Sequence, residues 1–191
     1  ALNNASLITA GGSNLVIANN IAFGGTSNTF DIGAGTTLTF NGILSGNTIF
    51  VKSGSGVLTI GGVSANTFSG TTTINGGTLN IAKTSALGGG AVTVNNTGTL
   101  GVIGTALTLS NILTLNTGSA IIDTNANGRN TFSGAISLSG TNTVTVGSPS
   151  GVLTLAGTIS GSTTLTKAGT GTLALSNNNS YSGTTTVTGG T

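Results

Sequence analysis

The chain contains no cysteine, histidine, methionine or tryptophan and only one proline, and charged residues make up 3% of its 191 positions. Without His and Cys, the chain has neither a Ser-His or Cys-His nucleophile pair nor the usual ligands of a zinc site. No apolar run approaches the roughly 20 residues that a membrane-spanning helix needs. We therefore expect no catalytic, cofactor-binding or metal-ligating residues, no cofactor, and no insertion of this segment into a membrane.

The few charged side chains are spread along the chain and do not form a patch. The net charge is +2, from Lys52, Lys83, Arg129 and Lys167 against Asp31 and Asp123. Nucleic-acid binding requires clustered Lys and Arg that displace counterions from phosphates. The sequence therefore predicts no nucleic-acid partner.

Glycine and small polar residues dominate the rest of the composition. There are 34 glycines, and Ser, Thr and Asn fill most of the other non-apolar positions. These residues are poor helix formers. The apolar residues alternate with polar ones, as in Val57-Leu-Thr-Ile60, which is the pattern of a half-buried strand. We expect an all-β chain in which Leu58 and Ile60 point inward and Thr59 points outward.

Two stretches of the chain are near copies of each other. Residues 42–60 return as residues 157–175 at an offset of 115, and residues 66–78 return as residues 179–191 at an offset of 113. The two missing residues fall in the loop between the blocks, where a repeat array tolerates length changes. The sequence therefore predicts a single β-solenoid segment over residues 1–191, in which the stretch 42–79 resembles the stretch 157–191.

A shorter period runs through this long repeat. The central apolar residues of similar segments are 20 to 23 residues apart, at Leu38, Leu58, Leu79, Leu100, Ile121, Val144 and Leu165. We interpret this period as one coil of a right-handed parallel β-helix with roughly 9 coils of about 21 residues, because crossovers between parallel strands are almost always right-handed. The alternative is an antiparallel sandwich, but repeated hairpins would not give a constant period.

The two carboxylates are too far apart to act together in such a solenoid. Asp31 and Asp123 are separated by 92 residues, or about 4.4 coils, which is roughly 20 Å along the axis at about 4.8 Å per coil. Paired-carboxylate glycosidases need about 5 to 10 Å, and calcium-binding nonapeptide repeats need an Asp in every turn. The sequence predicts that the protein is not an enzyme, and a carbohydrate-active β-helix is a remote alternative.

Two pairs of residues recur at the same repeat positions and have both a functional and a structural interpretation. Phe68 and Tyr181 offer aromatic rings that would stack on a sugar, but we favour a role in covering a corner of the core. Lys52 and Lys167 would meet an anionic glycan, but we favour solvated cations that discourage lateral sheet pairing. Both preferred interpretations are structural.

Asparagine runs and threonine pairs also have two interpretations. The run Asn177–Asn179 would form an Asn ladder or bind carbohydrate, but turn formation is favoured. Stacked threonines suggest ice binding as a remote alternative; since the pairs do not recur on every coil, we favour ordinary outward strand residues. The pairs are Thr37/Thr39, Thr71/Thr73, Thr143/Thr145 and Thr184/Thr186.

The order of motifs within the repeat is distinctive. From Gly42 to Leu79 the chain has G-x-[IL]-S-G, then K-x-G-x-G-x-L, then N-[ST]-[FY]-S-G-T-T-T-[IV]-x-G-G-T, and a second copy begins at Gly157. This order resembles the passenger-associated transport repeat, or autotransporter-associated β-strand repeat, of bacterial autotransporters. The resemblance implies a β-helical passenger exported across the outer membrane of a Gram-negative bacterium. The family's signal peptide and C-terminal translocator have no counterpart in these residues.

These observations favour a non-catalytic, extracellular stalk or fibre segment of an autotransporter-type adhesin on the Gram-negative cell surface. The alternative is a filament subunit that stacks end to end, because neither terminus has the pattern of a polar cap and Ala1-Leu2 would continue the pattern that stops at Thr191. With so little charge, exposed coils should associate. We therefore expect self-association, by axial stacking or lateral bundling, and contact with a host-cell or glycan surface.

Overall fold

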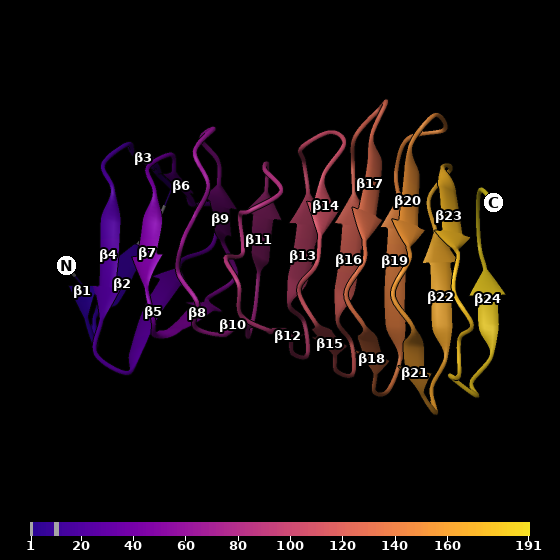
Figure 1. Cartoon of the computed structure of the whole chain (residues 1–191). Coiled ribbons are helices and arrows are strands. Elements are labelled where there is room, and N and C mark those ends of the chain that lie inside the picture. The colour runs from indigo at the N-terminus through magenta and orange to yellow at the C-terminus, as the bar shows by residue number, and fades with distance from the viewer. Residues whose placement is uncertain (1, 10–11) are drawn as a thin grey trace.

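The computed structural model describes residues 2–9 and 12–191, which form a rod of stacked coils. Within these ranges there are strands and turns but no helix, and hence no helix that could cross a membrane. Successive coils lie side by side from the N-terminus to the C-terminus (Figure 1). The strands pair in parallel, which confirms the β-solenoid over the antiparallel sandwich. Ala1, which would continue the pattern in the filament hypothesis, lies outside the described residues.

Four sheets run along the rod. Sheet A consists of β1 (Leu2–Asn3), β4 (Ile21–Gly24) and β7 (Leu44–Gly46). Sheet B consists of β2 (Ser6–Thr9), β5 (Ser27–Ile32), β8 (Ile49–Ser53), β10 (Thr72–Ile74), β12 (Val92–Val94), β15 (Leu113–Leu115), β18 (Ile136–Leu138) and β21 (Ile159–Gly161). Sheet C consists of β3 (Asn14–Ile17), β6 (Thr37–Phe40), β9 (Val57–Ile60), β11 (Thr78–Ile81), β13 (Thr99–Val102), β16 (Ala120–Asp123), β19 (Asn142–Val146), β22 (Leu165–Ala168) and β24 (Thr185–Val187). Sheet D consists of β14 (Thr108–Leu109), β17 (Arg129–Phe132), β20 (Val152–Leu155) and β23 (Thr172–Leu175).

Each coil has three sides, and the chain visits them in a fixed order. Sheets B and C form two sides along most of the rod, while sheet A takes the third side near the N-terminus and sheet D takes it near the C-terminus. Between sheets A and D, residues 61–71 and 82–91 cover the third side without a strand. Hydrogen bonds from the Thr67 N–H to the Leu44 carbonyl and from the Gly89 N–H to the Phe68 carbonyl link the coils across this gap.

The rod has about eight turns of about 22 residues, close to the roughly nine coils of about 21 residues that the sequence predicts. The register confirms the stacked column from Leu38 to Val144. The last predicted member of the column is wrong, because Val144 pairs with Lys167, and Leu165 pairs with Asn142. Leu165 and Lys167 both point inward on β22. A search for the next apolar residue therefore assigns Leu165 to the column, although Lys167 occupies that position.

Alternation along the strands places the core as the sequence predicts. Leu58 and Ile60 are fully buried, and Thr59 between them is half-buried on the outside. The buried hydrophobic side chains form one continuous cluster along the rod. Five phenylalanines contact each other near the N-terminus, with ring centroids 4.8 to 6.1 Å apart: Phe23, Phe30, Phe40, Phe50 and Phe68. Leu173 and Leu175, on the last full coil, pack against the core but are only partly buried.

The two copies of the long repeat lie on different sides of the rod. Strands β7, β8, β9 and β10 of the first copy belong to sheets A, B, C and B, whereas their equivalents β21, β22, β23 and β24 belong to sheets B, C, D and C. After β7, the chain passes the third side five more times before it reaches β21. The offset of 115 residues is therefore five coils plus one side, and every strand of the second copy lies one side further around.

Candidate functional site

Lys52, the charged residue of the first repeat, lies inside the rod. Its side chain is completely buried at the end of β8. The Nζ atom donates hydrogen bonds to three backbone carbonyls, those of Ser53 at 2.6 Å, Gly54 at 2.9 Å and Gly76 at 3.1 Å. Two of these carbonyls belong to the corner that follows Lys52, and the third belongs to the same corner one coil later.

Lys167, at the equivalent position of the second repeat, has the same arrangement. It is 2% exposed, and its Nζ donates to the carbonyls of Ala168 at 2.8 Å, Gly169 at 2.9 Å and Gly189 at 3.0 Å. The repeat therefore builds the same internal contact twice.

The expectation that these two lysines are solvated cations is wrong. Strand alternation directs Phe50 and Lys52 inward and Val51 outward. At the corner, carbonyls point into the rod and need donors, and an ammonium group supplies three. The alkyl stem of each lysine packs in the apolar interior up to that point. Neither Lys52 nor Lys167 is available to an anionic glycan or to a neighbouring rod.

Burial shifts the protonation of these side chains. Desolvation lowers the pKa of Lys52 to about 8, while the negative charge of Asp31 acts in the opposite direction. Burial also lowers the pKa of Lys167. The carbonyl oxygens accept hydrogen bonds from the charged ammonium form and stabilise it. At each site, three such hydrogen bonds oppose the free-energy cost of removing one charge from water.

A third lysine, which the sequence interpretation passes over, is also turned inward. The Nζ atom of Lys83 donates to the Ser64 carbonyl at 2.6 Å and to Oδ1 of Asn66 at 3.1 Å. Burial lowers the pKa of Lys83. Asn66 in turn accepts from the Leu44 N–H at 3.0 Å and donates to the Ala86 carbonyl at 2.8 Å, so that these side chains connect three successive coils.

The asparagine run of the second repeat binds backbone in a similar way. Oδ1 of Asn179 accepts from the Ile159 N–H at 2.9 Å, which is the same contact that Asn66 makes in the first repeat. Nδ2 of Asn177 donates to the Ala156 carbonyl at 3.0 Å. These contacts join the run to the backbone of the preceding coil, whereas turn formation by the run stays a prediction.

The aromatic pair lies against the core in both repeats. Phe68 is 1% exposed, and its ring stacks on that of Phe50 at 5.9 Å and meets the edge of Phe23 at 6.1 Å. Tyr181 is partly buried against the core, and its hydroxyl lies 2.6 Å from Oγ1 of Thr185. Phe68 has no free face on which a sugar ring could stack.

The two carboxylates lie in different sheets. Asp31 is on β5 in sheet B, and Asp123 ends β16 in sheet C. Asp123 is fully buried and accepts hydrogen bonds from the Asn125 N–H at 3.1 Å and from Nδ2 of Asn130 at 2.9 Å. Among residues 2–9 and 12–191, no group of three acidic, His or Cys side chains is placed to hold a metal ion.

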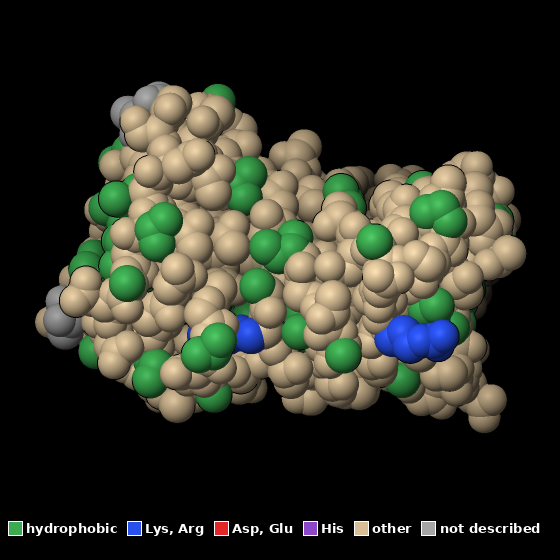
Figure 2. All heavy atoms as spheres, turned by 90° about the horizontal axis from the view of Figure 1, so that it is seen from above, with side chains coloured by type: hydrophobic (Ala, Val, Ile, Leu, Met, Phe, Trp, Pro, Cys, Tyr) green, Lys and Arg blue, Asp and Glu red, His purple; other side chains and the backbone are tan. Residues whose placement is uncertain are grey.

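The outer surface carries hydroxyl and amide side chains without a regular threonine array. Thr37 stacks on Val57, so the pair Thr37/Thr39 does not continue on the next coil, although Thr73, Thr93 and Thr114 stack as a single column in sheet B. Asparagines do form a short ladder outside sheet B, where Nδ2 of Asn95 donates to Asn75 at 2.8 Å and Nδ2 of Asn116 donates to Asn95 at 2.6 Å. On the face shown in Figure 2, hydrophobic side chains are scattered and charged ones are few.

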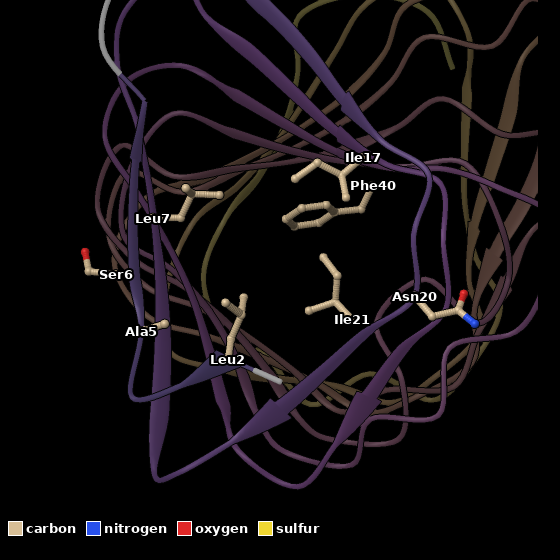
Figure 3. Close-up of a pocket in the computed structure, with 8 residues that line it drawn as sticks. All are labelled: Leu2, Ala5, Ser6, Leu7, Ile17, Asn20, Ile21 and Phe40. Carbon is tan, nitrogen blue, oxygen red and sulfur yellow. The ribbon is translucent and has the colours of Figure 1, made fainter.

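A cavity of about 390 Å³ lies at the N-terminal end of the rod. The side chains of Leu7, Ile17, Ile21 and Phe40 point into it, whereas Asn20 points away (Figure 3). Ligand pockets combine an apolar lining with convergent polar groups. This cavity has the apolar lining but lacks convergent polar groups, so it does not have the composition of a ligand pocket.

The family comparison matches both parts of the internal repeat. Residues 50–81 and 165–191 match the family described as Passenger-associated-transport-repeat. A protein named Adhesin BmaC autotransporter, from Brucella suis biovar 1 (strain 1330), is 35% identical over 156 residues, which cover 82% of this chain and 4% of the relative. The chain thus spans a small part of the length of the relative that it matches. No solved structure matches the chain.

Proposed function

The chain carries two passenger-associated transport repeats and belongs to the autotransporter passenger repeat family. We therefore propose that it is a non-catalytic stalk segment of a surface adhesin, held outside a Gram-negative cell. The observation that carries this proposal is the burial of Lys52 and Lys167. Each is the single charged residue of its repeat, and each is used to hold backbone inside the rod. A repeat that bound a ligand through this residue would present it on the surface.

The other repeated positions support the same function. Phe68 fills the core, and Asn66 and Asn179 hydrogen-bond to the backbone of the preceding coil. In a solenoid, stability is the sum of the coils and of the interfaces between neighbouring coils. The recurring residues act on those interfaces, which is what a long and stiff spacer needs.

The proposal is tested on the source bacterium with an antibody raised against the chain. We expect the antibody to label intact cells and, on a denaturing gel, to recognise a chain many times larger than 18.2 kDa. An antibody against a cytosolic protein is the control for cell integrity. Labelling that requires permeabilised cells contradicts the proposed location, and release of reducing sugars from a panel of polysaccharides by the purified chain contradicts the absence of catalysis.

A second candidate function is self-association of rods end to end. It is favoured by the low charge of the chain, 3% of its residues, because rods with so little charge hardly repel one another. We expect sedimentation velocity to show elongated species that grow with concentration. A monomer at all concentrations contradicts axial stacking. Lateral bundling and contact with a host-cell or glycan surface stay predictions.

A further inference from the structure

Residues 61–65 form a loop on the interrupted third side of the rod, in which Gly61 is buried and residues 63–65 are exposed. Val63 is 99% exposed, more than any other large hydrophobic side chain among residues 2–9 and 12–191, and Ser64 and Ala65 are also exposed. The loop follows β9, and no strand forms between residues 61 and 71. Exposed loops of small residues are where proteases cut folded proteins most readily.

We propose that this loop is a cleavage site for serine proteases of the elastase type, which act at the bond between Val63 and Ser64. Such proteases have a small apolar pocket for the residue before the cut bond, and Val63 fits it. In the reaction, water adds across the peptide bond, so that the Val63 carbonyl carbon becomes a carboxylate and the Ser64 nitrogen becomes a free amine. The inference concerns the chain itself and does not depend on the proposed stalk function.

The other residues that common proteases recognise are mostly buried. Trypsin-like enzymes need Lys or Arg, but Lys52, Lys83 and Lys167 are 0%, 8% and 2% exposed. Arg129 is exposed but begins strand β17, where the preceding carbonyl accepts from the Val152 N–H at 2.8 Å. The core phenylalanines are buried as well. Small aliphatic residues in exposed loops are therefore the accessible targets, and Val63 is the most exposed of the large hydrophobic ones.

Hydrogen bonds on both sides of the loop would hold the cut chain together. The Gly61 N–H donates to the Phe40 carbonyl and the Thr67 N–H donates to the Leu44 carbonyl, each at 2.8 Å. A rod cut at Val63 thus keeps its coil-to-coil contacts. The cut separates residues 1–63 from residues 64–191 only when the protein is denatured.

Between these two backbone hydrogen bonds, a side-chain contact also restrains the loop. The Ser64 carbonyl accepts a hydrogen bond from Nζ of Lys83 at 2.6 Å. A protease binds its substrate as an extended segment, so this hydrogen bond must break before Ser64 can enter the active site. Lys83→Met should therefore speed the cut by elastase about threefold to tenfold, because it removes a contact that is worth about one hydrogen bond.

The test uses the 191-residue chain with pancreatic elastase at limiting dilution and mass spectrometry of the products. The first cut is expected after Val63, with both fragments eluting together in native gel filtration and apart in urea. Val63→Asp should block this cut. Val63→Arg should remove the elastase cut and make trypsin cut at the same bond.

Ile112→Arg is the matched control for accessibility. Ile112 is 58% exposed, but its carbonyl accepts from the Val92 N–H at 2.8 Å and the following Leu113 N–H donates to the Ala135 carbonyl at 2.9 Å. We expect trypsin to cut this variant at least about tenfold more slowly than Val63→Arg, because two coil-to-coil hydrogen bonds beside the cut bond must break first.

Three outcomes would overturn the proposal. These are a first elastase cut elsewhere, unchanged cutting of the Val63→Asp variant, and equal trypsin rates for Val63→Arg and Ile112→Arg. Circular dichroism of each variant shows whether it is folded. If Val63→Arg does not fold, the comparison of wild-type and Val63→Asp digests decides the question.

Discussion

Lys52 and Lys167 make the same three hydrogen bonds on two different sides of the rod. Each Nζ atom donates to the carbonyls of the next two residues and to a carbonyl one coil further along. Because β8 belongs to sheet B and β22 to sheet C, the arrangement does not depend on the side of the solenoid. It is a property of the motif K-x-G and of the corner that the motif forms.

Removal of the Lys52 ammonium should destabilise the rod. Lys52→Met keeps most of the apolar stem but leaves three inward carbonyls without their donor, and we expect a loss of about 2 to 4 kcal/mol in the free energy of unfolding. Urea unfolding followed by circular dichroism measures it. Arg129→Met, at an exposed position, is the control and should change stability by less than about 0.5 kcal/mol. Equal effects of the two variants would mean that the internal contacts contribute nothing.

Stability should rise with pH in the alkaline range. The pKa of Lys52 is about 8 in the folded rod, below its ordinary value of 10.5, so between these values the unfolded chain holds more protons than the folded one. The free energy of unfolding must then increase from about pH 8 to pH 10. Burial of Lys83 and Lys167 acts with the same sign. Urea midpoints at pH 7, 8, 9 and 10 measure the rise, which should be smaller in Lys52→Met; a fall in stability over this range would contradict the inward burial.

The same substitution should have different effects at the two aromatic positions. Phe68→Ala removes a ring that is buried between Phe23 and Phe50, and we expect a loss of about 3 to 5 kcal/mol. Tyr181→Ala removes a partly exposed ring and should cost about 1 to 2 kcal/mol. Thermal and urea unfolding of both variants test this order. A larger loss for Tyr181→Ala would place the main aromatic contact in the second repeat.

Two glycines offer a test of the corner geometry. Gly46 has a φ of +116°, and a Cβ there would overlap the carbonyl oxygen of Phe23. Gly46→Ala should therefore cost about 2 to 4 kcal/mol. Gly89 has open space around its Cα, and its φ is not positive, so Gly89→Ala should be neutral or stabilising by up to about 1 kcal/mol. Differential scanning calorimetry compares them, and a stable Gly46→Ala variant would argue against this corner.

Periodicity and alternation were sufficient to predict the fold from the sequence. A constant period requires coils of similar length, and the placement of Leu58 and Ile60 follows from the two-residue alternation of a strand. The prediction for the two lysines is wrong because a charged side chain is not always exposed. The segment Ile49-Phe-Val-Lys-Ser53 already held the correct signal, since Lys52 lies two residues after Phe50 and so on the same face.

The register near the C-terminus could not be predicted for a related reason. The pattern of apolar residues assigns Leu165 to the stacked column, but a buried lysine can occupy a core position when its ammonium finds carbonyls. The side of the rod on which a repeat lies depends on the total length of the coils between the two copies. Loops can gain or lose a few residues in each coil without affecting the strands, and these small differences determine that total.

The shift of one side between the two copies has a consequence for neighbours of the rod. In a longer array with the same offset, successive copies would occur on each of the three sides in turn and return to the starting side after the third shift. Features carried by the repeat would then be spread around the circumference instead of aligned along one edge. A neighbouring cell or molecule would meet an equivalent surface from any direction of approach, and the rod would need no fixed orientation about its own axis.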